Sequence, residues 1–219
     1  MEQLLTTVTS HTQVVEQMKV LFLEAHPDDI ALSCSGTLFK HKAEMDDIYF
    51  ICMSDCNDLP RNKSLGKEVK KVMDCIGPTK EFRLRLKNRR LGTTSSRERI
   101  RGALERLRDK YDFDIVYSHW LGDIHQDHRA VAEETIRVFR HTRILMYENV
   151  HSTPHFNPNY YVTLRETEVR KKLSIIKMFK SQSKLYYAQP RIIRNRLESR
   201  GIEVKKDYAE AFIVWRLLA

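Results

Sequence analysis

The sequence predicts a single α/β domain with a Rossmann-like, three-layer α/β/α architecture and a mostly parallel sheet. Short apolar runs alternate with segments of helical periodicity through most of the 219 residues. Several of these runs are apolar at every position, which is typical of parallel strands that helices cover on both faces. A chain of this length can build one full core. We therefore expect one domain over residues 19–219, preceded by an N-terminal extension over residues 1–18.

The first half of the chain is predicted to contain three strands and three helices. Two strands have a continuous apolar run, at residues 20–23 and 48–53. The third alternates apolar and charged residues and so should have one face exposed to solvent. The second helix ends at Gly77-Pro78, a strong stop signal, and Ser95 or Ser96 is expected to cap the third. The strands are expected at residues 18–25, 47–53 and 81–86, and the helices at 29–43, 64–76 and 95–110.

The second half repeats the alternation of strand and helix, which favours crossover connections and a parallel sheet. A loop rich in His, Asn and Pro, residues 148–158, separates two of its strands. The strands are expected at residues 115–118, 143–147, 160–163 and 210–215, and the helices at 127–140, 167–180 and 190–201.

The composition is basic, with a formal net charge of +9 at pH 7. Two regions concentrate this charge: residues 61–108 hold sixteen Lys and Arg against five acids, and residues 165–206 hold thirteen against four. Such a balance suits an anionic partner, although a solvated surface explains most of these residues equally well. No nucleic-acid motif accompanies the charge, so we expect no nucleic-acid partner.

Cellular context is constrained by what the sequence lacks. No apolar run approaches the length of a membrane span, and the N-terminus shows no signal-peptide pattern. The four cysteines match no zinc-finger spacing, so free thiols in a reducing compartment are expected. These observations predict a cytoplasmic protein without a membrane span. They leave its oligomeric state open, including a homo-oligomer.

A first polar cluster follows the first predicted strand. His26-Pro27-Asp28-Asp29 stands where this strand ends and a helix begins. In open parallel sheets, ligands bind at the carboxyl ends of the strands. An imidazole and two carboxylates within four residues can form a metal site with a base beside it. The alternative is an ordinary strand-to-helix turn in which Asp28 or Asp29 caps the helix.

A second cluster, His125-Gln126-Asp127-His128, follows the strand at residues 115–118 and should reach the same edge of the sheet. A catalytic zinc takes three protein ligands and keeps one position open. His26, Asp29 and His128 could supply these ligands, which leaves Asp28 as a base and His125 to polarise a carbonyl or protonate a leaving group. Asp127 could orient His125. The alternative reading is that Asp127 caps its helix and the histidines lie at the surface.

These motifs resemble those of the PIG-L/LmbE-like de-N-acetylases. The first motif comprises residues 25–29, followed by Ala31-Leu32 and Gly36-Thr37-Leu38, and the second comprises residues 123–128. Lys172 to Ser181-Gln182 is similar to a late helix of the family, and residues 209–212 are similar to its closing strand. The resemblance covers nearly the whole chain in the right order.

The resemblance implies one Zn²⁺ per chain on His26, Asp29 and His128, with Asp28 as general base. It also implies that His125, oriented by Asp127, is the electrophilic or acidic partner. The implied reaction is hydrolysis of an N-acetyl group on a GlcNAc-type amino-sugar conjugate. Departures from the family pattern, among them Ile30 for a usual Glu and Gln126 for a usual Pro, lie mainly on the substrate side.

The substrate is the least determined part of this interpretation. Five residues in loops or helix starts could contact a small, anionic amino-sugar substrate, although each could equally be a solvated side chain: Arg61, Lys63, Arg89, Arg90 and His151. A metal-dependent amidohydrolase acting on a non-sugar N-acyl substrate, a phosphoesterase and a non-catalytic binder of anionic ligands are the alternatives. Asp28 and His125 argue against a non-catalytic binding protein, since neither residue is needed to hold a metal.

Overall fold

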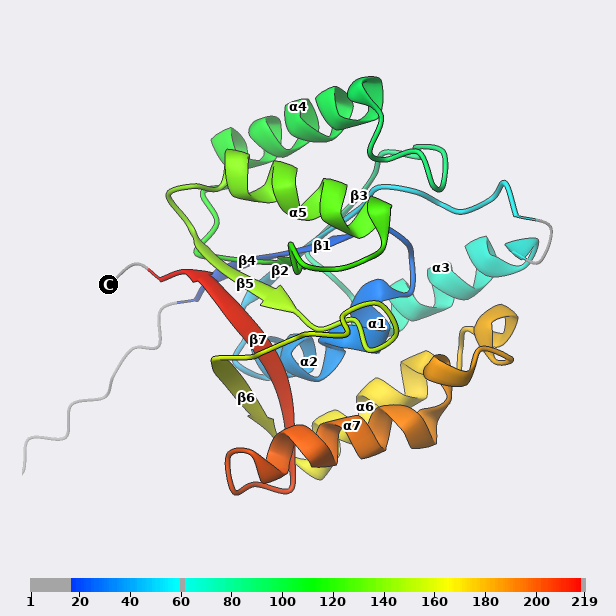
Figure 1. Cartoon of the computed structure of the whole chain (residues 1–219), viewed down its shortest axis with the longest axis vertical. Coiled ribbons are helices and arrows are strands. Elements are labelled where there is room, and N and C mark those ends of the chain that lie inside the picture. Colours follow the sequence, from blue (N-terminus) through cyan, green and yellow to red (C-terminus); the bar gives the residue numbers. More distant parts are fainter. Residues whose placement is uncertain (1–16, 60–61, 218–219) are drawn as a thin grey trace, which may run out of the picture.

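A computed structural model describes residues 17–59 and 62–217 and confirms the predicted single α/β domain (Figure 1). Most of the expected N-terminal extension lies outside the described residues. Seven strands form one sheet: β1 (Lys19–Glu24), β2 (Asp47–Cys52), β3 (Lys80–Arg83), β4 (Ile115–His119), β5 (Arg143–Tyr147), β6 (Tyr160–Leu164) and β7 (Tyr208–Arg216). The helices are α1 (Asp29–Ser33), α2 (Ser35–Ala43), α3 (Leu65–Ile76), α4 (Thr94–Tyr111), α5 (Gln126–Val138), α6 (Glu166–Ile176) and α7 (Pro190–Ile202).

The strand order is β3-β2-β1-β4-β5-β7-β6, and β7 runs antiparallel to both of its neighbours. The other pairings are parallel. The chain moves outward from β1 to β3 in one direction and then from β4 to β5 in the other. The boundary between β1 and β4 is therefore the switch point of the sheet, where open α/β folds bind ligands.

Helices cover both faces of the sheet, with α4 and α5 on one side and the other five helices on the opposite side (Figure 1). Strand β1 shows why its central residues, 20–23, are all apolar. Phe22 packs toward the five-helix face and is stacked between Phe50 and Tyr117. Leu21 and Leu23 point to the other face. Because helices cover both faces, residues 20–23 are buried and apolar, and charged residues occur only at the two ends of the strand.

Element boundaries differ from the predicted ones in a few places. The predicted helix over residues 29–43 is two helices that meet at Cys34, whose φ of −134° is not helical. The N-cap of α4 is Thr93, whose side chain accepts a hydrogen bond from the Ser96 amide, rather than Ser95 or Ser96. The late helix predicted over residues 167–180 ends at Ile176 and continues as a short 3₁₀ turn, Lys180–Gln182.

Two further expectations can be compared with the structure. All four cysteines are free, as predicted. Within the described residues, none of the helices combines the length and the apolar character that crossing a bilayer requires.

Candidate metal centre and active site

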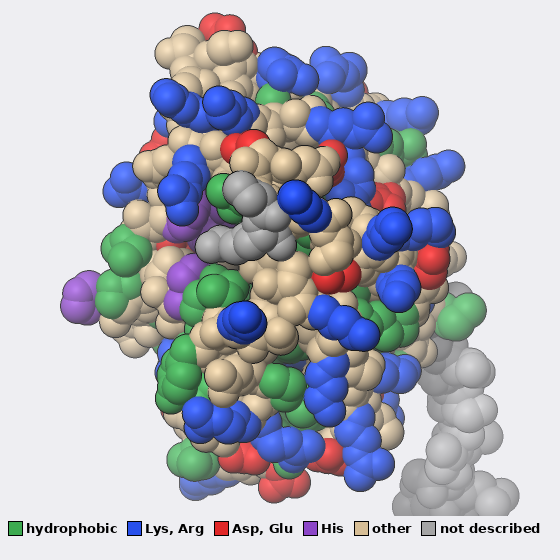
Figure 2. Space-filling view, turned by 90° about the vertical axis from the view of Figure 1, so that its right-hand side faces the viewer, with side chains coloured by type: hydrophobic (Ala, Val, Ile, Leu, Met, Phe, Trp, Pro, Cys, Tyr) green, Lys and Arg blue, Asp and Glu red, His purple; other side chains and the backbone are tan. Residues whose placement is uncertain are grey.

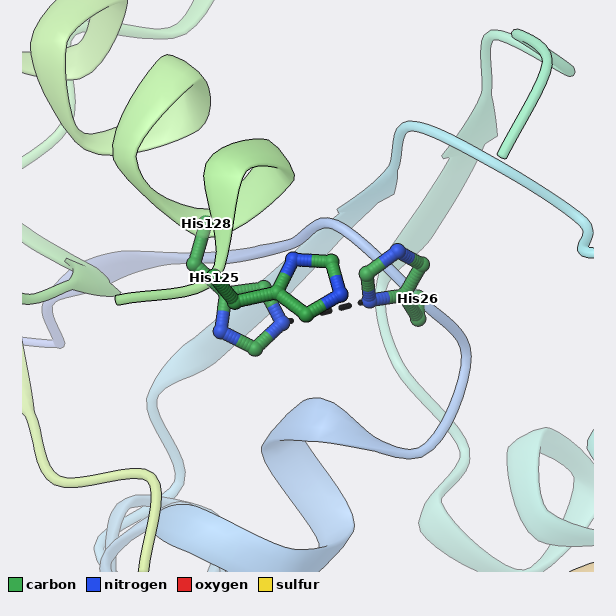
Figure 3. A group of neighbouring side chains, drawn as sticks. All are labelled: His26, His125 and His128. Carbon is green, nitrogen blue, oxygen red and sulfur yellow. Dashed lines mark hydrogen bonds between the residues drawn. The ribbon is translucent and has the colours of Figure 1, made fainter. Parts of the chain in front are cut away.

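The two polar clusters meet at the switch point of the sheet. His26 follows β1, while His125 and His128 lie at the start of α5 after β4, and their rings converge (Figure 3). The turn after β1 is closed on itself, because the His26 amide donates to Asp29 Oδ2 and the Asp29 amide donates to the His26 carbonyl. This reciprocal pair directs the His26 imidazole and the Asp29 carboxylate to the same place.

Two of the aspartates considered as helix caps, Asp28 and Asp127, do not cap their helices with their side chains. Asp28 is the N-cap residue of α1, but its side chain makes no capping hydrogen bond. The N-cap of α5 is His125, whose Nδ1 accepts from the Asp127 amide at 3.2 Å. Asp127 and His128 are both buried within the first turn of α5. The expectation that Asp127 caps its helix is therefore wrong, as is a surface position for His128, whereas His125 is partly buried and caps α5.

Three side chains have the spacing of a metal-ligand set. His26 Nδ1 lies 3.2 Å from His128 Nε2 and 3.5 Å from Asp29 Oδ2, and His128 Nε2 lies 3.4 Å from Asp29 Oδ1. Ligands on a tetrahedral ion at about 2.1 Å are roughly 3.4 Å apart. Asp29 and His128 are buried and His26 is nearly so. The donor set, two imidazoles and one carboxylate, suits zinc and fits an ion placed between the three residues.

Two other histidines lie close enough to be considered as ligands. His119 is fully buried, and its Nε2 accepts a hydrogen bond from the Ala25 amide at 3.0 Å. That nitrogen is therefore already occupied, and burial lowers the pKa of His119 to about 4. His125 uses Nδ1 as an acceptor, so the proton of its neutral ring is on Nε2. A protonated nitrogen is a donor rather than a metal ligand.

Each candidate ligand imidazole has a carboxylate on its second ring nitrogen. Asp123 Oδ2 lies 2.8 Å from His128 Nδ1, and Asp127 Oδ2 lies 3.1 Å from His26 Nε2. Such pairs fix the tautomer and the orientation of a metal-binding imidazole. They leave His26 Nδ1 and His128 Nε2, the two nitrogens that face each other, to receive a metal.

The carboxylate of Asp127 has a different partner from the predicted one, His125. Its carboxylate does not reach His125 but bonds to His26 and to the amides of Arg89 and Leu91. The cause is the start of α5: His125 precedes the helix and bends back over the Asp127 amide, whereas the Asp127 side chain points toward β1. Asp127 therefore orients the other histidine cluster.

Asp123 is the main residue that the sequence reasoning did not assign. It accepts hydrogen bonds from Ser152 Oγ and from the His125 amide while it contacts His128. Asn149 is a second, since its side-chain amide donates to Asp29 Oδ1 at 3.3 Å. Asp123 stands inside the second motif, so the presence of two carboxylates beside two histidines could have indicated it. Asn149 and Ser152 come from the β5–β6 loop and have no comparable sequence signal.

Nearby carboxylates give the two candidate ligand histidines, His26 and His128, a high affinity for protons in the absence of a cation. Burial alone would lower the pKa of His26, but Asp29 and Asp127 outweigh it and raise that pKa to about 10. Asp29 and Asp123 likewise outweigh burial and raise the pKa of His128 to about 9. The pKa of Asp29 is held well below its ordinary value by His128, His119 and His26, against the effect of burial. The site therefore holds positive charge strongly.

Asp28 and His125 have shifted pKa values of the opposite sense. Burial, and then the charge of Asp29, raises the pKa of Asp28 to about 6. Burial, and then the charges of His128 and His26, lowers the pKa of His125 to about 4. At neutral pH, Asp28 is thus a carboxylate that accepts a proton readily and His125 is a neutral N–H donor.

These groups line one cavity of about 600 Å³ that is open to solvent. Figure 2 shows its face of the molecule, where histidine side chains are visible in a hollow and Lys and Arg side chains surround it. Arg89 and His151 line the cavity, and the His151 ring stacks on Tyr187 with 4.0 Å between centroids. Lys63 and Arg90 are exposed and do not line it. Arg61 lies outside the described residues.

The chain matches a family model described as PIG-L: GlcNAc-PI de-N-acetylase over residues 21–139. This match covers more than half of the chain and both polar clusters, and the chain belongs to this family. No curated protein sequence matches it.

Several solved structures share the fold. The conserved protein TT1542 from Thermus thermophilus has a TM-score of 0.78 and 21% identity, with 93% of this chain and 97% of that chain covered. N,N'-diacetylchitobiose deacetylase from Pyrococcus horikoshii has a TM-score of 0.74 and 22% identity, with 90% and 83% covered. GalB, the 4-carboxy-2-hydroxymuconate hydratase from Pseudomonas putida, has a TM-score of 0.74 and 16% identity, with 92% and 98% covered. A deacetylase and a hydratase share this fold, so the function must be argued from the site.

Proposed function

We propose that the protein is a zinc-dependent N-deacetylase that hydrolyses the acetamide of a GlcNAc-type amino sugar. The observation that carries the proposal is the pairing of a three-ligand group with a proton-accepting carboxylate and a neutral imidazole in one cavity. Membership in the PIG-L family supports the reaction. The fold shared with the chitobiose deacetylase supports a sugar acetamide as the reacting group.

His26, Asp29 and His128 would hold one zinc ion per chain. Zinc bound there would lower the pKa of a water molecule and polarise the acetyl carbonyl. Asp127 and Asp123 act as positioning residues, because they hold the two imidazoles in the tautomers that present His26 Nδ1 and His128 Nε2 to the ion.

Asp28 and His125 divide the proton chemistry between them. Asp28 takes the proton from the attacking water as the new C–O bond forms. His125 donates its Nε2–H to the oxyanion that develops on the acetyl oxygen. The low pKa of His125 makes it a poor source of a full proton. Asp28, protonated in the first step, then gives its proton to the departing amine as the C–N bond breaks.

The pH profile follows from the raised pKa of Asp28. The base must be ionised, so kcat/KM should rise with pH as Asp28 loses its proton, and a bound cation favours the carboxylate further. We therefore expect the acid limb of kcat/KM to have its midpoint at or below about pH 6. Zinc content measured at each pH separates this limb from loss of metal. A midpoint above pH 7 at constant zinc content would contradict the role given to Asp28.

The reaction itself is tested by a panel of acetamides in which acetate and free amine are both quantified. N-acetylglucosamine, its glycosides and chitobiose-type disaccharides represent the proposed class, and N-acetylated amino acids represent the alternative amidohydrolase. Release of acetate from sugars but not from amino acids supports the proposal. Release of acetate only from the amino acids would move the function to the alternative class.

A further inference from the structure

The segment between β3 and α4 places Arg89, whose side chain is exposed, at the wall of the active-site cavity and holds its backbone there. The Arg89 amide donates to Asp127 Oδ2 at 2.7 Å, and the Leu91 amide donates to Asp127 Oδ1 at 3.1 Å. Gln126 Nε2 donates to the Arg89 carbonyl at 2.8 Å. The backbone is therefore held on both sides of the Arg89 side chain by the residues that open α5.

Arg89 occupies a backbone conformation that favours glycine. Its φ is +59°, in the left-handed region where a Cβ meets steric resistance. Glycine would adopt this conformation freely. The chain nevertheless places one of its longest side chains here, on a backbone that three hydrogen bonds fix. Five other non-glycine residues among those described also have a positive φ, so the conformation alone does not mark a functional residue, but at Arg89 it coincides with the wall of the cavity.

The charge of Arg89 is not neutralised by the protein. Over residues 17–59 and 62–217, its guanidinium has neither an ion-pair nor a hydrogen-bond partner, although its side chain lines the cavity with Asp28 and His125. Among the described residues, several arginines are paired with carboxylates, whereas others, such as the exposed Arg90, are not. Arg97 and Arg101 both bond to Glu134, and Arg196 and Arg200 both bond to Glu148. Asp29 contacts the candidate ligand histidines and Asp127 contacts His26. Asp28 lines the cavity together with Arg89, but within the described residues the two form no ion pair.

We infer that Arg89 is a specificity residue that binds an anionic substituent, a phosphate or a carboxylate, on the substrate. This inference rests on the proposed deacetylase function and names the substrate class of the same site. A guanidinium presents a planar fork of donors that pairs with either anion through two parallel hydrogen bonds. Because Arg89, Asp28 and His125 line the same cavity, a charged substituent could contact Arg89 while the acetamide lies at the candidate ligand group.

The test compares charged and neutral substrates in three variants. Arg89→Gly removes the guanidinium and suits the left-handed backbone, Arg89→Lys keeps the charge without the fork, and Arg90→Ala removes an exposed arginine outside the cavity. The probes are N-acetylglucosamine 1-phosphate and 6-phosphate, N-acetylglucosaminuronic acid and neutral N-acetylglucosamine. The two phosphates and the uronic acid show which anion is preferred.

In the wild type, kcat/KM should be at least about 10-fold higher for one charged substrate than for N-acetylglucosamine, as expected for a charge-assisted bidentate contact. Arg89→Gly should lower kcat/KM about 10- to 100-fold for that substrate and less than about 2-fold for the neutral sugar. Arg89→Lys should fall between these values, and Arg90→Ala should match the wild type. Equal losses on charged and neutral substrates, or no charge preference in the wild type, would overturn the inference.

Failure of this inference can be told apart from failure of the proposed function. If the protein deacetylates neutral and charged sugars equally well, the proposed deacetylase function stands and the role of Arg89 is contradicted. If no sugar releases acetate, calorimetric binding of N-acetylglucosamine 1-phosphate is compared between wild type and Arg89→Gly. If binding then depends on Arg89, the anion site is supported although the deacetylase function is contradicted. If the sugar phosphate does not bind at all, both the anion site and the deacetylase function are contradicted.

Discussion

Replacing Asp28 by asparagine is expected to lower kcat by about 10²- to 10⁴-fold while the bound zinc stays at the wild-type level. Asparagine has nearly the same shape but cannot accept the proton of the attacking water. Asp28 makes no hydrogen bond that holds a ligand histidine, so the ligand group should be undisturbed. Single-turnover acetate release and metal analysis on the same sample check both halves of this expectation.

The fold should tolerate this change. The raised pKa of Asp28 means that the folded protein disfavours its charge, so a neutral side chain of the same size should not reduce stability. Thermal unfolding of the metal-free variant therefore serves as the control. Full activity in Asp28→Asn would contradict the assignment of the base, and loss of zinc would show that Asp28 belongs to the ligand group instead.

Replacing Asp29 by asparagine is expected to have the opposite phenotype, a loss of zinc affinity greater than about 100-fold. Substitution of residues that only support a ligand typically costs 10- to 100-fold, and Asp29 is proposed as a ligand itself. It also supplies the negative charge that offsets the cation in a buried site. Competition with a chromogenic chelator measures the affinity.

Asp58→Asn is the matched control for this variant, because Asp58 is an exposed aspartate in the loop after β2, at the same edge of the sheet. It should bind zinc as the wild type does. The low activity of Asp29→Asn should recover in part at high zinc concentration, whereas that of Asp28→Asn should not. Wild-type affinity in Asp29→Asn would remove Asp29 from the ligand group.

The sheet, and the edge of it that carries the candidate site, could be predicted because both follow from local sequence patterns. Continuous apolar runs mark strands that are buried on both faces, and β1 shows this with Leu21 and Phe22 on opposite sides. The two histidine clusters each follow such a strand. The sequence placed both clusters at one edge of the sheet, but that β1 and β4 are neighbours is a matter of topology that local patterns do not encode.

The details that could not be predicted depend on side-chain direction. Asp127 was assigned to His125, two residues before it, but the first turn of α5 points its carboxylate at His26, about a hundred residues earlier. The helix break at Cys34 has no Gly or Pro signal. The contacts of Asn149 and Ser152 arise from a loop whose path no periodicity describes.

The most direct test of the central claim is a zinc titration of the metal-free protein in which acetate release from an N-acetylated amino sugar is followed. Activity should be absent at the start, rise in proportion to added zinc and reach a plateau at one ion per chain. Acetate release at the full rate by the metal-free protein would contradict the account. So would a fully zinc-loaded protein that deacetylates no amino sugar.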